Sequence, residues 1–573
     1  MNTEPSLAGI LEPVFAIRTE DDLGLGDTEG VRQMVDWCAR HHLQIFQTLP
    51  INETSDDNSP YNAISSLAIE PGTIAISPRL LPDLPPAKFQ KIAQPRLVRE
   101  LRRGRVNYLK AKALKFALLQ AAFDFFWQQH WQKNSPRAAD FRRFLLENSC
   151  WLSDYALFRV LMEENGHLSD WERWRPEHRT PQQAQTWLLS LTEKQREAMV
   201  RRQIFFCYVQ WVAFGQWQSV KAYAQKGRVM LMGDIPFGVS RCSADVWANR
   251  DIFDLDWSGG APPEKTFKVD LFTEKWGQNW GIPNYRWDVL RRRGFDWWRT
   301  RVGILRQNFH LYRIDHVLGF FRIYSFPWTP VHNAEFLSLD EHQAAAKTGG
   351  RLPGFKEFPD DTPEHKEANQ RQGEELLRVV LEASGDTGVI AEDLGVVPDY
   401  VPTTLRKLGL PGFRIPTFFR ERDGSYCDPA HYPRLSLTQP ATHDHPPLAA
   451  VWAEHWRQID AGHNVEENRR ELRRIMDFAR SPQDPIPHEF TAALHEAYMR
   501  RVAQSNSRFV VVMITDVFGQ TARFNTPGAV SDENWSTRME HTVAELDKDP
   551  ALLAKTESYA KLVAEAGRSG AEV

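Results

Sequence analysis

Residues 229–237 read VMLMGDIPF, a short apolar run with an acidic residue and a proline near its C-terminal end. Apolar runs of this length, bounded by turn residues, are typical of strands that are buried in a parallel sheet. The preceding segment, 203–226, carries apolar and aromatic residues at helical spacing. A strand that follows a helix in this way is the unit from which parallel α/β sheets are built.

The same pattern recurs along the whole chain, with helical stretches between the runs. Eight runs point to a closed barrel, so the predicted fold class is α/β, a (β/α)8 TIM barrel with large helical insertions between its strands. The eight predicted strands are 9–18, 43–51, 229–237, 310–317, 388–395, 412–419, 435–444 and 508–516.

The chain is longer than one barrel requires, because 573 residues exceed the roughly 250 that the fold needs. We expect residues 72–227 to form a mainly helical insertion subdomain, and residues 1–71 and 228–573 to form the catalytic barrel with loop insertions. The insertion shows apolar residues at helical spacing. These residues are Leu109, Ala113, Phe116, Phe123 and Trp127.

A second departure from a minimal barrel follows the fourth predicted strand. Residues 340–369 are polar and contain Pro353, Pro359 and Pro363, so we expect a long excursion in this connection.

Composition narrows the functional classes. Apolar residues make up 42% of the chain and charged residues 25%, as in ordinary globular proteins. A net charge of -4 gives no electrostatic reason to expect nucleic acid or an anionic membrane as a partner. No long apolar run and no signal peptide stand out, and the five cysteines lack metal-site or disulfide spacing. We therefore expect a cytoplasmic protein without a membrane partner.

Acidic residues end four of the predicted strands. They are Asp234, Asp315, Glu392 and Asp444. Because the active site of this fold lies at the C-terminal ends of the strands, these carboxylates are expected to converge on one rim.

Several carboxylates on one rim suit the retaining chemistry of glycosidic bonds. One acid acts as the nucleophile, and a second gives a proton to the leaving oxygen and later takes one from the acceptor. A third can hold the sugar hydroxyls as positive charge develops, and an arginine can keep the nucleophile ionised. Arg313 precedes Asp315 by two residues and therefore shares its face of the strand.

An ordered set of motifs resembles that of the 4-α-glucanotransferases, also called amylomaltases or disproportionating enzymes. The similarity extends from about residue 9 to about residue 540 and includes the later landmarks at 410–412, 525–528 and 534–535. The main motifs are SPY (59–61), GDIP (233–236), SADVW (243–247), GQNWG (277–281), RIDH (313–316), AEDLG (391–395) and THD (442–444).

The resemblance implies an enzyme that moves α-1,4-glucan segments between maltooligosaccharides or to glucose, with no cofactor and no metal. It implies that Asp315 is the nucleophile, Glu392 the acid and base, and Asp444 the residue that stabilises the distorted sugar. If Glu392 is the acid, its pKa should be raised toward neutrality. The resemblance also implies a set of substrate-binding residues, namely Arg313, His443, Asp234, Ser59, Tyr61, Gln278, Trp280 and Asn525.

The chain departs from the family pattern in four places that border the expected groove. His445-Pro446-Pro447 replaces the usual Asn-Asp after the third acid, and 264–267 lacks the usual Tyr-Phe pair. The segment 52–58 has no glycine, and the excursion at 340–369 is longer than expected. We expect these changes to affect the acceptor side and the preferred substrate length.

Other interpretations explain less of the sequence. His443, His445, Asp315 and His316 could form a metal site of a barrel hydrolase, but this leaves the other motifs unexplained. The glycines of 24–30 miss the GxGxxG spacing of a dinucleotide site. A non-catalytic glucan-binding protein would not need three retained carboxylates. A retaining α-1,4-glucan hydrolase shares the first half-reaction and stays open as an alternative. The sequence shows no pattern that fixes the oligomeric state.

Overall fold

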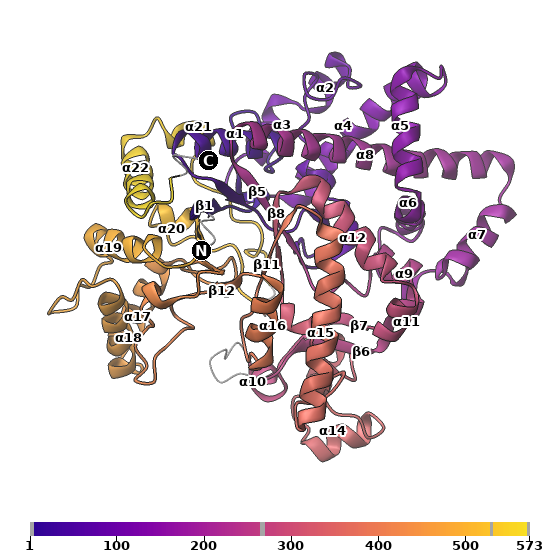
Figure 1. The fold of residues 1–573 in the computed structure, drawn as a ribbon. Coiled ribbons are helices and arrows are strands. Elements are labelled where there is room, and N and C mark those ends of the chain that lie inside the picture. The colour runs from indigo at the N-terminus through magenta and orange to yellow at the C-terminus, as the bar shows by residue number, and fades with distance from the viewer. Residues whose placement is uncertain (1–4, 264–269, 528–530, 570–573) are drawn as a thin grey trace.

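The computed structural model of the chain describes residues 5–263, 270–527 and 531–569. A closed barrel of eight parallel strands lies at its centre, in the order β1-β14-β13-β12-β11-β8-β5-β2 (Figure 1). Each predicted run contains or overlaps one of these strands, so the (β/α)8 prediction is confirmed. The strands are β1 (Leu7–Leu11), β2 (Ile45–Gln47), β5 (Met230–Ile235), β8 (Leu311–Ile314), β11 (Gly388–Ala391), β12 (Gly412–Arg414), β13 (Ser436–Thr438) and β14 (Phe509–Met513).

The barrel strands are buried on both faces. All five residues of β14 are buried, and β1 pairs with them in register from Leu7 opposite Phe509 to Leu11 opposite Met513. Close packing also explains Gly233 on β5, because a Cβ atom there would lie 2.5 Å from the Phe309 ring. Apolar burial of this kind is the main stabilising contribution to such a fold.

The first strand ends earlier than its predicted run. Pro13 follows β1 and lacks the N–H that a ladder would need, and Val14–Ala16 forms a short 3-10 helix instead. The apolar residues after position 11 are buried in this turn rather than in the barrel wall.

A run of seven helices separates a hairpin, β3 (Asn52–Thr54) and β4 (Ala63–Ile69), from β5. The last of these helices, α8, is 34 residues long and leads back to the barrel (Figure 1). The helices are α2 (Pro86–Ile92), α3 (Pro95–Leu101), α4 (Tyr108–Phe126), α5 (Pro136–Glu147), α6 (Ser149–Glu164), α7 (Pro181–Ser190) and α8 (Glu193–Lys226).

The predicted apolar face of α4 is partly wrong. Leu109 is 84% exposed and Ala113 is also exposed. The buried face is instead formed around Leu114, Leu118 and Phe126, which pack against α8 and its neighbours. Helical spacing alone allowed either face, because α4 is apolar on most of its circumference.

A second sheet, in the order β10-β9-β6-β7, stands beside the barrel rim. Its strands are inserted after β5 and β8, and the predicted excursion at 340–369 supplies the edge strand β10 together with helix α14. The elements of these two connections are α9 (Ala244–Ala248), β6 (Phe253–Ala261), α10 (Leu271–Trp276), β7 (Gln278–Tyr285), α11 (Trp287–Arg292), α12 (Asp296–Asn308), β9 (Ile323–Phe326), α13 (Asn333–Phe336), α14 (Glu341–Lys347), β10 (Gly354–Lys356) and α15 (Pro363–Ser384).

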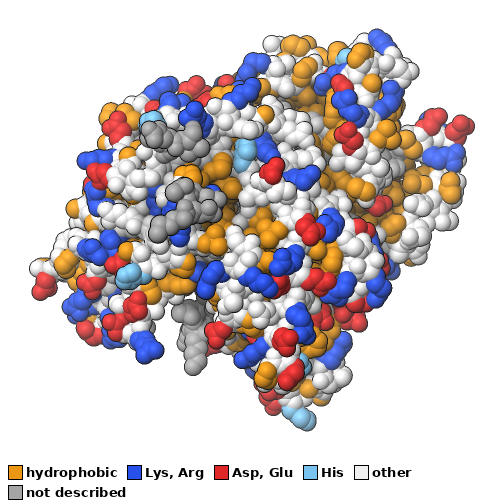
Figure 2. Space-filling model, viewed as in Figure 1, with side chains coloured by type: hydrophobic (Ala, Val, Ile, Leu, Met, Phe, Trp, Pro, Cys, Tyr) orange, Lys and Arg blue, Asp and Glu red, His pale blue; other side chains and the backbone are white. Residues whose placement is uncertain are grey.

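The remaining helices surround the barrel. Across the part of the chain that the structure describes, no helix is both long and apolar enough to cross a membrane. Side chains of both charges are spread over the face in Figure 2. The remaining helices are α1 (Thr28–Arg40), α16 (Tyr400–Leu408), α17 (Leu448–Asp460), α18 (Val465–Phe478), α19 (Ala492–Ala503), α20 (Ile514–Val517), α21 (Val543–Leu546) and α22 (Pro550–Glu565).

Candidate active site

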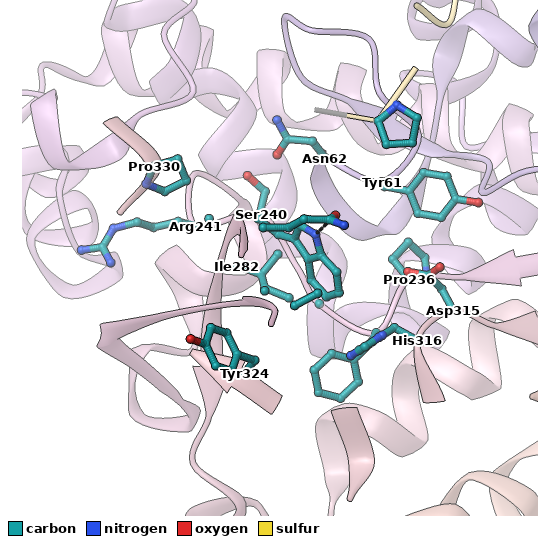
Figure 3. Close-up of a pocket in the computed structure, with 18 of the residues that line it drawn as sticks. Tyr61, Asn62, Pro236, Ser240, Arg241, Ile282, Asp315, His316, Tyr324 and Pro330 are labelled. Carbon is teal, nitrogen blue, oxygen red and sulfur yellow. Dashed lines mark hydrogen bonds between the residues drawn. The ribbon is translucent and has the colours of Figure 1, made fainter. Parts of the chain in front are cut away.

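A groove of about 1580 Å³ lies at the C-terminal ends of the barrel strands (Figure 3). The three predicted catalytic residues, Asp315, Glu392 and Asp444, all line it. Six of the eight predicted substrate-binding residues line it as well, namely Ser59, Tyr61, Gln278, Trp280, Arg313 and Asn525.

Arg313 on β8 holds three carboxylates together. Its guanidinium donates to Asp315 Oδ1 at 2.8 Å and to Asp234 Oδ2 at 2.6 Å, and its Nη2 lies 3.7 Å from Glu392 Oε2. Because Asp315 Oδ1 and Glu392 Oε2 share one nitrogen neighbour, the two oxygens are at most about 6.5 Å apart. That separation fits the roughly 5 to 5.5 Å of retaining sites better than the wider spacing of inverting ones.

Glu392 lies directly after β11, with a side chain only 10% exposed. Its Oε2 accepts a hydrogen bond from the backbone N–H of His316 at 2.7 Å, and its Oε1 accepts one from Leu394. Burial raises the pKa of Glu392 to about 7; Arg313 opposes this shift, and the neighbouring Asp315 carboxylate adds to it. A carboxyl group with this pKa can both give and take a proton near neutral pH.

The adjacent acid, Asp393, serves the barrel instead of the groove. Its Oδ1 accepts the backbone N–H of Phe413 at 2.6 Å, and Arg414 lies 3.3 Å from its Oδ2. Gly412 makes room for it, because a Cβ atom there would lie 2.6 Å from Asp393 Oδ2. The two neighbouring acids of the AEDLG motif thus have separate structural environments.

Asp444 follows β13 and is held ionised. Burial acts to raise its pKa, but His443 and the Asn525 amide hold the pKa of Asp444 well below its usual range. Asn525 Nδ2 donates to Asp444 Oδ1 at 2.6 Å, and His443 Nε2 lies 3.3 Å from Oδ2. A fixed negative charge of this kind can stabilise a developing oxocarbenium ion.

Asp234 and His443, unlike the other predicted binding residues, do not line the groove. Both are buried behind it, at 1% and 2% exposure. Asp234 accepts a hydrogen bond from the Tyr61 hydroxyl at 2.7 Å, and burial raises the pKa of Asp234 to about 6. The His443 ring stacks on Tyr61 with centroids 5.0 Å apart. Both residues therefore fix Tyr61 from behind.

Two aromatic side chains form walls of the groove. Tyr61, stacked on His443, also packs against Trp535, which lines the groove too. Trp280 is 39% exposed and meets the His316 ring edge-on at 4.8 Å, and its indole N–H donates to Gln278. Aromatic faces at these positions match the apolar C–H faces of sugars.

Ser59 keeps a structural contact within its own turn. Its hydroxyl accepts the backbone N–H of Tyr61 at 3.3 Å, so it shapes the loop that carries the aromatic wall.

The histidines of the alternative metal-site hypothesis make other contacts. Within residues 5–263, 270–527 and 531–569, no three His, Cys, Asp or Glu side chains are grouped to hold a metal ion. His443 stacks on Tyr61, His445 Nδ1 lies 2.7 Å from the Thr442 hydroxyl, and the His316 ring packs on Trp280.

Three of the four departures from the family pattern line the groove. The segment 52–58 does so through Ser55 and Asp57. His445 does so next to Phe418, at a centroid distance of 5.1 Å, and burial lowers its pKa to about 4. The excursion does so through Arg351 and Phe355. The departure at 264–267, like Gly528 of the 525–528 landmark, lies outside the described residues.

Sequence reasoning missed two contacts to the predicted catalytic acids. The backbone N–H of His316 binds Glu392, and Arg523 donates to the backbone oxygen of Asp444 at 2.6 Å. A backbone contact depends on local geometry, here a φ of 46° at His316, which residue types do not reveal.

Comparisons with known proteins agree with this geometry. A family model described as 4-alpha-glucanotransferase matches residues 12–543. The 4-alpha-glucanotransferase of Chlamydia caviae is 31% identical, over 94% of this chain and 91% of that protein. The 4-alpha-glucanotransferase of Thermus thermophilus is 30% identical, over 86% and 87%.

Solved structures share the fold. Amylomaltase from Streptococcus agalactiae aligns with a TM-score of 0.74 at 22% identity, over 98% of this chain and 99% of that one. Amylomaltase from Corynebacterium glutamicum aligns with a TM-score of 0.75 at 20% identity, over 98% and 75%. With the family model and the relatives above, these findings show that the chain belongs to the 4-alpha-glucanotransferase family.

Proposed function

We propose that this chain transfers α-1,4-glucan segments between maltooligosaccharides, or to glucose, in two displacements at one anomeric carbon. The observation that carries the proposal is Arg313, which binds Asp315 and reaches Glu392 across the groove. A guanidinium in this position pairs with a carboxyl oxygen of the proposed nucleophile, while burial raises the pKa of Glu392 to about 7, so that Glu392 can give a proton near neutral pH.

In the first displacement, Asp315 attacks the anomeric carbon as the glycosidic C–O bond breaks. Glu392 gives its proton to the departing oxygen, and a glycosyl ester forms on Asp315. Asp444 stabilises the positive charge that develops on the sugar ring.

In the second displacement, an acceptor hydroxyl attacks the same carbon. Glu392 takes its proton, and the Asp315 carboxylate is released. Two inversions give net retention of the α configuration. The backbone N–H of His316 supports the ionised form of Glu392 during this stage.

For the groove, we propose that Tyr61 packs on the sugar that reacts. Arg313, His443 and Asp234 hold the Tyr61 side chain in place for this contact. Trp280 and Gln278 then contact the next sugar on the acceptor side, beside His316. Ser59 shapes the Tyr61 loop, and Asn525 orients Asp444.

We further propose that residues 72–227 act as a helical insertion on a catalytic barrel built from 1–71 and 228–573. The uninterrupted series of helices from α2 to α8 supports this division. A cytoplasmic location is proposed because all five cysteines are free thiols. The mechanism uses only carboxylates and hydrogen bonds, so it requires no cofactor.

The test is to incubate the purified protein with maltotriose alone and resolve the products by chain length. We expect glucose together with a series of longer maltooligosaccharides. Asp315→Asn should form neither, because the amide cannot act as the nucleophile. Asp386→Asn is the matched control, since Asp386 is exposed and is not among the residues that line the groove.

Accumulation of glucose and maltose without longer products would show that water is the acceptor and would replace transfer by hydrolysis. Products formed equally by Asp315→Asn would remove the assignment of the nucleophile.

A further inference from the structure

The groove continues past Glu392 into an outer arm, which we define by Tyr324, Phe355, Val396 and Pro398. All four side chains line the groove. Tyr324 lies on β9, Phe355 on β10, and the other two in the loop that follows Glu392. Val396 is 57% exposed, and the other three are half-buried. The arm therefore presents apolar side chains to solvent within the groove.

The excursion at 340–369 builds one side of this arm. Phe355 is directly opposite Tyr324 in the β9–β10 pair, and the two rings meet at 5.3 Å. The Arg322 guanidinium lies 3.6 Å from the Phe355 ring centre and covers one of its faces. Figure 3 shows Tyr324 in the same groove as Asp315 and His316.

A partly buried polar cluster fixes the excursion against the loop on the other side. Asp360 accepts hydrogen bonds from the Tyr400 hydroxyl at 3.0 Å and from Asn369 at 2.9 Å, and it pairs with Arg322 at 3.1 Å. Tyr400 begins α16, two residues after Pro398. The two walls of the arm are thus tied to each other and can hold a ligand without first closing.

The position of the arm relative to Glu392 identifies its occupant. A general acid lies on the side of the leaving oxygen, which is also the side that the acceptor enters. The loop that carries Val396 and Pro398 starts at this acid, so the arm extends the acceptor side. A single glucose bound next to Glu392 does not extend along this loop.

We propose that the outer arm binds the outer glucose units of a long acceptor, a linear α-1,4-glucan of several residues. The proposal rests on the transferase function above and adds the substrate class that the acceptor side prefers. Apolar C–H faces of glucose pack on Phe355 and Tyr324, and the Tyr324 hydroxyl, which has no partner among the described residues, is free to bind a sugar hydroxyl.

The test separates acceptor binding from donor binding. α-Maltosyl fluoride serves as the donor, because its leaving group leaves the acceptor side empty. Initial rates of transfer to isotopically labelled glucose and to labelled maltohexaose are compared in the wild type, Phe355→Ala and Tyr324→Phe. We expect Phe355→Ala to raise KM for maltohexaose about tenfold and to leave KM for glucose within about twofold.

Two further variants control for folding and for position. Val396→Trp narrows the arm at an exposed site without opening a cavity and should likewise raise KM for maltohexaose alone. Phe358→Ala is the matched control, because Phe358 lies on the same excursion, is 40% exposed, and packs on His365 outside the groove. It should change neither KM.

The outcomes separate the two proposals. Equal loss with both acceptors in Phe355→Ala, or no loss with either, overturns the outer arm as a site for long acceptors. A wild-type protein that transfers maltosyl groups to neither acceptor overturns the transferase proposal itself.

Discussion

Transfer from maltotriose should decline above pH 7, because Glu392, as the proposed acid, enters the reaction protonated. Burial raises the pKa of Glu392 to about 7, against the effect of Arg313. About half of the free enzyme then carries this proton at pH 7, about a tenth at pH 8 and about a hundredth at pH 9. We therefore expect kcat/KM to fall about fivefold from pH 7 to 8 and about fiftyfold from pH 7 to 9.

The assay compares two donors over the range from about pH 5 to 9. Maltotriose needs a proton for its leaving oxygen, whereas α-maltosyl fluoride releases fluoride without one. The rate with maltotriose should fall at high pH. The initial burst of fluoride released from α-maltosyl fluoride should not. Glu392→Gln should keep this burst and lose activity on maltotriose.

A flat kcat/KM for maltotriose between about pH 6 and 9 would refute the reasoning, because it requires an acid with another pKa. The same fall with both donors would also refute it, since the titrating group would then act in a step other than protonation of the leaving oxygen.

Three further changes test other parts of the molecule. Asn525→Ala should lower kcat on saturating maltotriose about tenfold, because Asp444 loses a donor at 2.6 Å; an unchanged kcat would contradict this role. Tyr61→Phe should lower kcat/KM by roughly three- to tenfold by removing the contact to Asp234, and Tyr61→Ala should lower it further, so equal losses would argue against stacking. Burial raises the pKa of Glu12 to about 8 in the folded protein. The stability contributed by its protonated form is therefore full below about pH 4.5 and is lost as the pH rises toward 8, by up to about 1.4 kcal/mol per pH unit. Glu12→Gln should therefore raise Tm at pH 8 but not at pH 5. A difference in calorimetric Tm between the two proteins that is the same at both pH values would contradict this.

The barrel could be predicted because each strand is a short run buried on both faces, as in the FVVVM of β14. The limits of the elements were harder to predict. Pro13 ended β1 where the apolar pattern continued, and α4 buried the face around Leu118 rather than the one that includes Leu109. At β1 the missing N–H of Pro13 outweighed the apolar pattern, whereas on α4 apolar residues occur on more than one side, so that tertiary packing decided which face is buried.

For the site, the sequence predicted the acids because each one lies at the end of a barrel strand or in the loop that follows it. The sequence indicated Glu392 but assigned no role to Asp393, whose contacts within the barrel depend on space left by Gly412. Nor could it predict the outer arm, because Tyr324, Phe355 and Val396 come from three separate segments and meet only through the pairing of β9 with β10 and the contacts of Asp360.

The contact between His316 and Glu392 has a consequence for mutation. The donor is a peptide N–H, so exchanging the side chain leaves it in place. The φ of 46° at this position suits glycine or asparagine and excludes proline, whose ring fixes φ near -65° and removes the N–H. Substitutions at position 316 that keep this backbone conformation should thus change the side chain on the groove wall and leave the hydrogen bond to Glu392 in place.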